Sequence, residues 1–205
     1  MRIGVVGAGR IGGNLARLLV KSGHEAFISY SRDPQELQRR AVDIGAQAGS
    51  VGEATAFGDV VVLSVPWRSI DAVIAEMGSL VGRIDTTNHF AAGGVADLPH
   101  NHTAAQANQA RMPGARLVKA YNTLTARFQA DTAGRTGADR VVMFFCGDDA
   151  AAKTTVSELI EDSGFTPFDV GGLADAAVME APRRPGAVYG EEFHRADAEQ
   201  FFADR

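Results

Sequence analysis

The chain has 205 residues, 45% of them hydrophobic, which is enough for one large domain or a domain with a small appendage and argues against a disordered chain. Its formal net charge is −5 and it has no long basic run, so the sequence gives no support for binding to nucleic acid or to a membrane surface. The single cysteine, Cys146, cannot form an internal disulfide, no apolar run approaches roughly 18 residues, and no secretory signal is visible. We therefore expect a cytoplasmic protein.

Short apolar runs alternate with helical patterns along the chain. The expected strands are 2–7, 25–30, 46–50, 59–66, 83–88, 115–122, 140–147 and 166–171. The expected helices are 11–23, 33–45, 51–58, 69–78, 103–112 and 149–164, while 89–102 and 181–190 are expected to be irregular. This alternation predicts an α/β fold: a Rossmann-type doubly wound parallel sheet with a small C-terminal α/β extension. We place the domain boundary between residues 1–125 and 126–205.

Three residues indicate where the helix at 33–45 begins. Asp33 is expected to be the N-cap, and Pro34 suits the first helical position because its missing N–H is not needed there. Glu36 is expected to close a capping box with Asp33.

A glycine motif, Gly7-Ala8-Gly9-Arg10-Ile11-Gly12, follows the first expected strand and opens the first expected helix. In dinucleotide-binding proteins the first glycine of G-x-G-x-x-G allows a tight turn, the second lets the backbone approach a pyrophosphate, and the third lets the helix pack on the strand. The helix N-terminus then offers free N–H groups and a partial positive charge to the phosphates. The alternative is a plain glycine-rich turn. We expect Gly7, Gly9, Arg10, Ile11 and Gly12 to bind a dinucleotide.

The end of the second expected strand indicates which dinucleotide is bound. An NAD site requires an acid there, which accepts a hydrogen bond from the ribose 2′-hydroxyl. This chain has Ser31 and Arg32, and a hydroxyl beside a guanidinium suits a 2′-phosphate instead. Asp33 follows directly, but its expected role is the helix N-cap. The sequence therefore predicts NADP(H), unless Arg32 is only a solvated surface arginine.

Two further strand ends are expected to face the same crevice. Val65 and Pro66 end the fourth expected strand and Trp67 follows it, and Pro66 is expected to turn the chain beneath the cofactor. Trp67 either forms a wall beside the nicotinamide or is a packed loop aromatic. Asn88 and His89 follow the next strand; the amide could bind the carboxamide or ribose, and the histidine could donate a proton or be solvated.

Asn122 ends the expected strand at 115–122, close to Lys119. On a helix K-x-x-N would suggest a catalytic lysine, but on a strand the two side chains are expected to point to opposite faces. His100 and His102 lack the spacing and the additional ligand of a metal site, so we expect no metal. With no obvious general acid, the crevice favours a hydride acceptor that needs little help with protons, such as a flavin-like ring.

With these residues noted, the chain resembles the family of NADPH-dependent deazaflavin (coenzyme F420) reductases. The resemblance extends over nearly the whole chain, through "ISYSR", "GDVVVLSVPW", "DTTN", "ARLVKAYNTL" and "FFCGDDAAAKTTVSELIEDSGF". It implies a Rossmann domain, a small C-terminal part over the nicotinamide, direct hydride transfer between NADPH and the deazaflavin, and often a homodimer.

The resemblance implies that Gly9 to Gly12 cradle the pyrophosphate, that Ser31 and Arg32 hold the 2′-phosphate, and that Pro66 and Asn122 lie near the nicotinamide or its partner. The chain departs from the family at Asn88-His89, where the family usually has Asn-Pro, in the loop 89–102 and in the tail. These segments are expected to face the substrate, so they bear on the acceptor.

Three functions remain open on the sequence. The first is transfer of hydride from NADPH to a deazaflavin; the second keeps NADPH but uses a flavin, quinone, imine or ketone, with His89 as a proton donor. The third is an NADP(H)-binding sensor without turnover. A homodimer is also expected, because Phe193, Phe201 and Phe202 near the C-terminus are apolar rings that should not be left in water.

Overall fold

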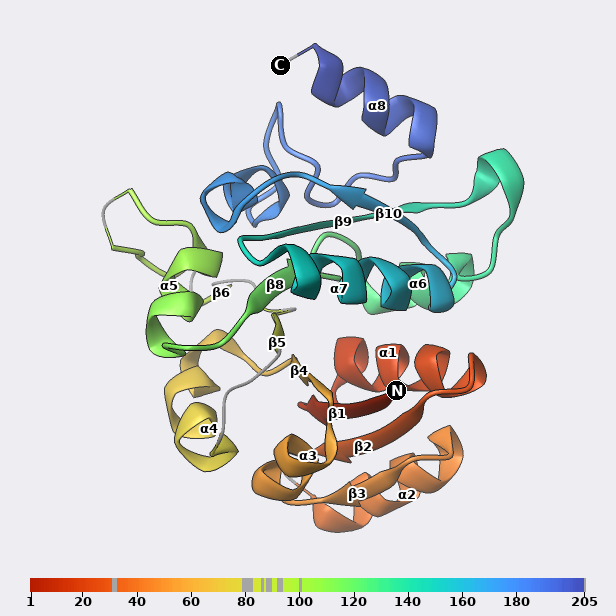
Figure 1. Ribbon diagram of the computed structural model, residues 1–205, viewed down its shortest axis with the longest axis vertical. Helices are drawn as coiled ribbons and strands as arrows, with labels where there is room; N and C mark the ends of the chain where they lie inside the picture. Colours follow the sequence, from red (N-terminus) through yellow and green to blue (C-terminus); the bar gives the residue numbers. More distant parts are fainter. Residues whose placement is uncertain are drawn as a thin grey trace.

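The structure is a computed structural model of the chain, and it describes residues 1–30, 33–78, 83–85, 87, 90–91, 94–99 and 101–204. Its main sheet is built from β1 (Arg2–Val6), β2 (Glu25–Ser29), β3 (Gln47–Gly49), β4 (Val60–Leu63), β5 (Arg83–Asp85), β8 (Leu117–Ala120), β9 (Val142–Gly147) and β10 (Thr166–Asp169). The strand order is β10-β9-β8-β5-β4-β1-β2-β3, so the two edges are β10 and β3 (Figure 1).

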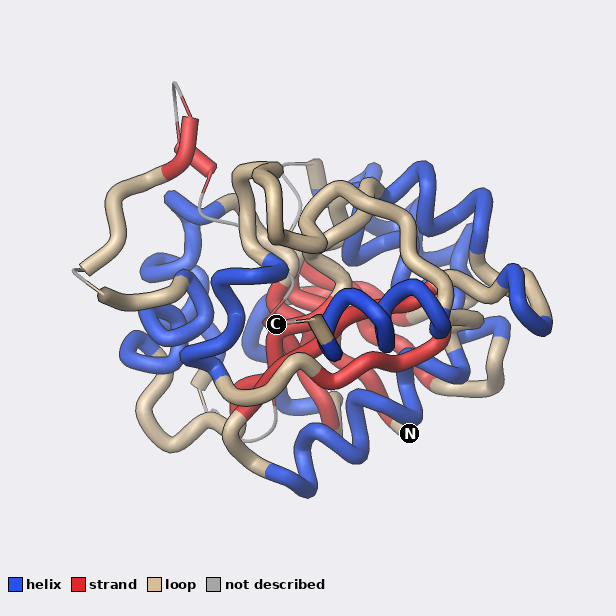
Figure 2. Tube along the Cα trace, turned by 90° about the horizontal axis from the view of Figure 1, so that it is seen from above, coloured by secondary structure: helices blue, strands red, loops and turns tan. Residues whose placement is uncertain are grey.

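The helices lie on both faces of this sheet, and Figure 2 shows the strands enclosed between them. One face packs against α1 (Arg10–Lys21), α2 (Pro34–Ile44) and α7 (Ala150–Asp162). The other face packs against α3 (Val51–Phe57), α4 (Ile70–Met77), α5 (Ala104–Arg111) and α8 (Arg195–Ala203). The α/β architecture predicted from the sequence is confirmed.

The sheet differs from the prediction at one pairing. Its neighbouring strands run parallel, as predicted, except that β9 runs antiparallel to β8, with Ala120 opposite Phe145 and Val118 opposite Gly147. The segment between these two strands contains α6 (Ala126–Thr132). After this segment the chain is still at the edge of the sheet where β8 ends. Because the chain does not cross back to the other end of the sheet, β9 can only return antiparallel. Both β9 and β10 extend the same sheet, and the boundary at residue 125 stays a prediction.

The predicted start of α2 is confirmed in two of its three parts. Asp33 Oδ1 accepts hydrogen bonds from the N–H groups of Gln35 and Glu36, and Pro34 begins the helix. The predicted capping box is wrong, because the Glu36 carboxylate pairs with Arg39 and Arg40 along the helix instead. The i,i+3 and i,i+4 cations lie on the same helix face as Glu36, and they compete with the cap for its carboxylate.

Several short elements have no counterpart in the sequence prediction. They include α6, α8, a 3-10 helix at Leu173–Met179, and the two-stranded β6 (Phe90–Ala91) and β7 (Gly94–Val95) within the segment expected to be a loop. Among the residues that the structure describes, no helix is long and apolar enough to span a bilayer.

Aromatic rings hold α8 and the segment before it against the sheet. Phe193 and Phe202 lie 5.4 and 5.9 Å, centroid to centroid, from Phe144 of β9, and Phe201 contacts both of them. Phe202 also stacks on Phe168 of β10 at 5.1 Å. These rings are therefore partly buried within the chain, which weakens them as a reason for a second subunit. The homodimer stays a prediction.

Candidate functional site

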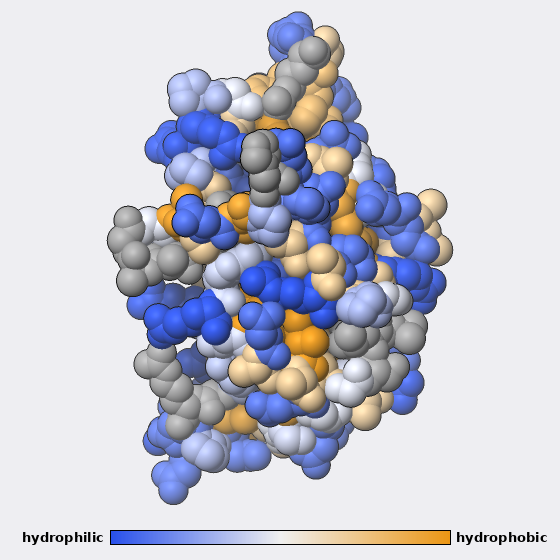
Figure 3. Space-filling view, turned by 90° about the vertical axis from the view of Figure 1, so that its left-hand side faces the viewer, coloured by the Kyte–Doolittle hydropathy of each residue, from blue (hydrophilic) through white to orange (hydrophobic). Residues whose placement is uncertain are grey.

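A cleft of about 780 Å³ opens at the carboxyl ends of β1, β4 and β8. One side is the glycine wall, which we define as residues 7–12 and 64–67; the other is the C-terminal wall, residues 121–126 and 183–190. Thr87 also lines the cleft. Figure 3 views the molecule from the left of Figure 1, where β1 ends and α1 begins, and shows hydrophobic surface in a hollow bordered by hydrophilic side chains. A ligand-binding crevice is expected at this edge of an α/β sheet.

The three motif glycines have different reasons to be glycine. A Cβ on Gly7 would lie 2.1 Å from the carbonyl oxygen of Ser64, and its φ is +111°. A Cβ on Gly12 would lie 2.2 Å from the carbonyl oxygen of Gly7. A Cβ on Gly9 would meet no atom within 4 Å. The protein itself therefore requires glycine at positions 7 and 12, whereas at position 9 the space above the backbone is open.

The space above Gly9 lies at the N-terminus of α1. Gly9 is the N-cap residue and supplies no side-chain cap, and the first turn contains no acidic residue. The N-terminal N–H groups of a helix need an acceptor, and an anion suits the positive end of the helix dipole. Arg10 and Ile11 line the cleft beside this loop. The motif thus has the geometry that a pyrophosphate requires.

A second lobe of about 690 Å³ continues from the cleft toward the end of β2, and Gly9, Ser64 and Pro66 line both. Its other lining residues include Tyr30, Asp33, Glu36, Arg40 and Arg68. Arg40 is occupied by protein partners, because it donates to the carbonyl oxygens of Ala8 and Gly9 and pairs with Glu36. Ser31 and Arg32, predicted to bind a 2′-phosphate, lie outside the described residues.

The residues that follow β4 form the base of the glycine wall. Val65, Pro66 and Trp67 all line the cleft, as predicted. Trp67 is only 9% exposed, and the Arg111 guanidinium lies over its ring at 4.4 Å from the centroid. Arg111 also pairs with Asp71 at 3.0 Å. Trp67 is therefore a packed aromatic held by a cation–π contact, and its edge contributes to the cleft.

Lys119 is fully buried behind the C-terminal wall rather than in the cleft. Its Nζ donates to the carbonyl oxygen of Thr87 at 2.7 Å and lies 3.6 Å from Glu180 Oε1. Glu180, 3% exposed, also accepts the N–H groups of Ala104 and Ala105 at the start of α5. A buried charge is stable only with such partners. These contacts give Lys119 a structural role, and its part in catalysis stays untested.

Asn122 lies in the C-terminal wall and lines the cleft. Its Nδ2 donates to the carbonyl oxygen of Met179 at 2.6 Å, next to the Glu180 that pairs with Lys119. The expectation that Lys119 and Asn122 point to opposite faces is therefore wrong, because both reach the same segment. The cause is Tyr121, which has φ +59° beyond the end of β8 and interrupts the alternation of a strand.

The sequence reasoning missed part of the C-terminal wall. Arg183 and Tyr189 line the cleft, and burial raises the pKa of the Tyr189 phenol. Arg183 and Tyr189 come from a Pro- and Gly-rich segment with no periodic pattern, so only the nearby arginine pair in "PRRPG" could have drawn attention to them. Asn88 and His89, both predicted to face the site, lie outside the described residues.

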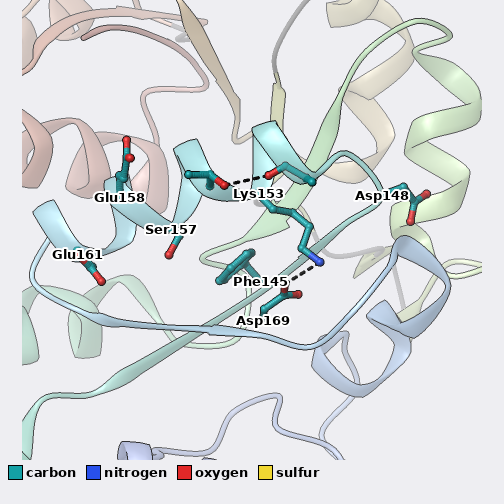
Figure 4. Close-up of a pocket in the computed structure, with 9 residues that line it drawn as sticks. Phe145, Asp148, Lys153, Ser157, Glu158, Glu161 and Asp169 are labelled. Atoms are coloured by element: carbon teal, nitrogen blue, oxygen red, sulfur yellow. Dashed lines mark hydrogen bonds and ion pairs between the residues drawn. The ribbon is translucent and has the colours of Figure 1, made fainter.

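A separate depression of about 480 Å³ lies at α7 and β10 and shares no lining residue with the cleft (Figure 4). Its main feature is an ion pair between Lys153 Nζ and Asp169 Oδ2 at 2.6 Å. Glu158 and Glu161 lie farther along α7. A partly exposed pair of this kind is common on protein surfaces, and this depression has no link to the glycine motif.

Comparison with known proteins connects this geometry to a family. Residues 2–89, which contain the glycine motif and β1 to β5, match the family model described as NADP oxidoreductase, coenzyme F420-dependent. The chain is 31% identical over 182 residues to the metalloreductase STEAP3 of Rattus norvegicus. That match covers 88% of this chain but 36% of the relative, so the chain spans about a third of that protein's length.

Two solved structures extend the likeness to the whole fold. A hypothetical protein from Sinorhizobium meliloti is 30% identical, with a TM-score of 0.81 and 95% of each chain covered. A proposed F420-dependent NADP-reductase from Arthrobacter sp. has a TM-score of 0.71 at 24% identity, covering 86% of this chain and 87% of its own, which shows a shared fold. Residues 2–89 thus match the model of coenzyme F420-dependent NADP oxidoreductases, and the fold of nearly the whole chain is shared with these two solved structures.

Proposed function

We propose that this protein is an oxidoreductase that transfers hydride between NADP(H) and a small acceptor, with a deazaflavin such as coenzyme F420 as the favoured acceptor. The observation that carries the proposal is the contrast among the motif glycines. Gly7 and Gly12 are required by protein packing, but the open space above Gly9 at an uncapped helix N-terminus serves no protein contact. A pyrophosphate is the group that this space and these N–H donors suit.

Placing the pyrophosphate there assigns the two lobes. The adenosine half would lie in the lobe beside Tyr30, and the nicotinamide half in the cleft beside Pro66 and Asn122. The preference for NADP(H) over NAD(H) rests on the family and on Ser31 and Arg32 in the sequence. We expect NADP(H) to bind at least about tenfold more tightly than NAD(H), a difference of about 1.4 kcal/mol.

The chemistry of the cleft favours positioning over proton transfer. When bound, NADPH supplies a hydride from its nicotinamide C4, and a deazaflavin accepts it at C5 while its ring takes up one proton from solvent. Among the described lining residues the charged groups are Arg10 and Arg183; none is Asp, Glu, His or Lys. The walls can therefore orient two rings, and orientation alone can contribute ~7–11 kcal/mol in favourable cases.

The identity of the acceptor is the part that needs the sharpest test. One relative is named a metalloreductase, so an acceptor other than a deazaflavin must be included. Stopped-flow oxidation of NADPH should be followed with a deazaflavin, a flavin, a quinone, an imine, a ketone and a ferric chelate. We expect the deazaflavin to react fastest. Fast oxidation by the imine or ketone alone would replace the deazaflavin proposal, and NADPH binding without turnover would favour a sensor.

A substitution of His89 offers a second way to distinguish a deazaflavin acceptor from an imine or ketone. It lies outside the described residues, and in the alternative with an imine or ketone it would donate the proton. Removing a general acid costs about 10²–10⁴-fold in rate. For a deazaflavin we expect His89→Ala to keep a single-turnover rate within about tenfold of the wild type. A thousandfold loss with unchanged binding would show that the acceptor demands a proton from the protein.

A further inference from the structure

We infer that Asn108 and Arg111, on a helix that does not line the cleft, are positioning residues for the nicotinamide ring, and that they act through Thr87 and Trp67. This inference rests on the proposed function and assigns to it two residues outside the cleft. Both belong to α5, and none of the described lining residues of the cleft comes from that helix. Their effect on hydride transfer must therefore pass through the residues that they contact.

The first step is the spacing of the two residues on α5. Asn108 and Arg111 lie three positions apart, so their side chains share one face of the helix, and Arg111 Nη1 donates to Asn108 Oδ1 at 2.9 Å. Asn108 is fully buried, and the side chain of Arg111 is 28% exposed. Because the amide oxygen of Asn108 accepts from Arg111, its NH₂ group is turned the other way, and this group donates to Thr87 Oγ1 at 3.0 Å.

The second step is what Arg111 holds at the neighbouring strand end. Its Nε lies 3.0 Å from Asp71 Oδ1 of α4, and its guanidinium lies over the ring of Trp67. A guanidinium can stack through its face while its edge donates hydrogen bonds, which an ammonium group cannot do. Arg111 thus fixes Trp67 after β4, and Asn108 fixes Thr87 after β5. Both of these contacted residues line the cleft.

The third step is how α5 is anchored to the C-terminal wall. Its first two N–H groups donate to the carboxylate of Glu180, and the preceding residue, Met179, accepts the hydrogen bond of Asn122. One helix therefore ties together residues at the ends of β4, β5 and β8 that border the space beside Pro66 and Asn122. The proposed function puts the nicotinamide in this space, and a ring held between fixed walls reacts faster than one that can turn.

The fluorescence of bound NADPH tests the inference without requiring turnover. In the wild type the polarisation of this emission should decay only as fast as the whole protein rotates, because the ring is held. Arg111→Gln and Thr87→Val should each add a fast decay from local motion of the ring. The Kd for NADPH should stay within about twofold, since neither variant changes the glycine motif that is proposed to bind the pyrophosphate. Trp67 is the single tryptophan of the chain, so a shift of its emission to longer wavelength in Arg111→Gln reports that Trp67 is more exposed.

Single-turnover hydride transfer tests the same variants with the acceptor that the wild type reduces fastest. We expect rates about tenfold lower for Arg111→Gln, Asn108→Leu and Thr87→Val. Asn108→Leu combined with Thr87→Val should lose no more rate than Thr87→Val alone, because Asn108 acts through Thr87. Thr87→Ser keeps the hydroxyl that Asn108 holds, so it should keep the rate.

The matched control is Arg116→Gln. Arg116 is an exposed arginine that follows shortly after α5 and does not line the cleft, so this variant should behave as the wild type in both measurements. Thermal unfolding of every variant sets a temperature at which all of them are folded. Because Asn108 is buried, Arg111→Gln and Thr87→Val decide the inference if Asn108→Leu does not fold.

The outcomes separate this inference from the proposed function. Ring motion or hydride-transfer rates that Arg111→Gln and Thr87→Val leave unchanged would overturn the inference, and so would additive losses in the double variant or an equal loss in Arg116→Gln. Hydride transfer by the wild type would still uphold the proposed function in each of these cases. Added ring motion in Arg111→Gln and Thr87→Val, in a protein that binds NADPH but reduces no acceptor, would support the inference and refute the proposed redox function.

Discussion

The two walls of the cleft are built in different ways. The glycine wall owes its shape to contacts among residues close in the sequence or on neighbouring strands, such as Gly12 against Gly7. The C-terminal wall is held by contacts between residues far apart, such as Asn122 with Met179 and Glu180 with Ala104. A short motif can specify the first wall, whereas the second exists only when the whole chain is folded. We therefore expect some substitutions in the glycine wall to abolish ligand binding alone, and substitutions behind the C-terminal wall to destabilise the fold.

The largest expected effects come from two substitutions in the glycine wall, one of which should remove the ligand and the other destabilise the fold. Gly9→Val should abolish NADPH binding and leave the unfolding temperature nearly unchanged, because its side chain would occupy open space that the pyrophosphate needs. Gly12→Val should destabilise the fold by about 1–3 kcal/mol or more, because its side chain would collide with a backbone carbonyl. Calorimetric titration and thermal melting measure both. Normal NADPH binding by Gly9→Val would mean that the loop holds another ligand.

The next largest effect concerns the support behind the C-terminal wall. Lys119→Met leaves the carboxylate of Glu180 buried without its cation, and losses of about 3–5 kcal/mol are typical when one partner of a buried pair is removed. Urea unfolding measures the change. If the variant is folded at low temperature, single-turnover hydride transfer should stay within about tenfold of the wild type. A loss of the hydride-transfer rate at unchanged stability would instead show that Lys119 takes part in catalysis.

Asn122→Ala should have a smaller effect, and one that appears in both stability and turnover. It removes the hydrogen bond to Met179, which ties the first segment of the C-terminal wall to the 3-10 helix at Leu173–Met179, at a cost of about 1 kcal/mol. Because Asn122 lines the cleft, we also expect kcat to fall by about tenfold while the Kd for NADPH is little changed. Equal losses in NADPH affinity and kcat would show that Asn122 binds the dinucleotide rather than aligning the two rings.

The smallest effect should come from the far end of the sheet, away from both walls. Arg2 Nη2 lies 2.6 Å from Asp59 Oδ1, and its hydrogen bonds hold the pKa of Asp59 below the usual 3.8. A lowered carboxyl pKa stabilises the fold above the ordinary pKa, and this contribution is lost as the pH falls through the folded-state value. Asp59→Asn should therefore be slightly less stable than wild type at neutral pH and equal to it in strong acid. NADPH affinity should be unchanged, and a changed affinity would show that the two ends of the sheet are coupled.

Much of the fold and half of the site followed from local patterns. Alternating apolar runs and helical periods predicted the strands and helices of the sheet, and Asp33 with Pro34 predicted where α2 begins. The order Gly7, Gly9, Gly12 between a strand and a helix predicted the geometry of the loop, because a tight turn and a close helix contact act within six residues. These features depend on backbone sterics and on periodicity, which a sequence displays directly.

The rest was decided by tertiary structure. The antiparallel return of β9 depends on where the chain leaves β8, and no property of either strand records it. Phe193, Phe201 and Phe202 have the composition of an interface, but they pack on Phe144 and its neighbours because β9 and β10 lie beneath them. Lys119 and Arg183 are both cations in the sequence. Only the fold gives one a buried partner in Glu180 and sets the other at the rim of the cleft, because burial and proximity arise from contacts between distant segments.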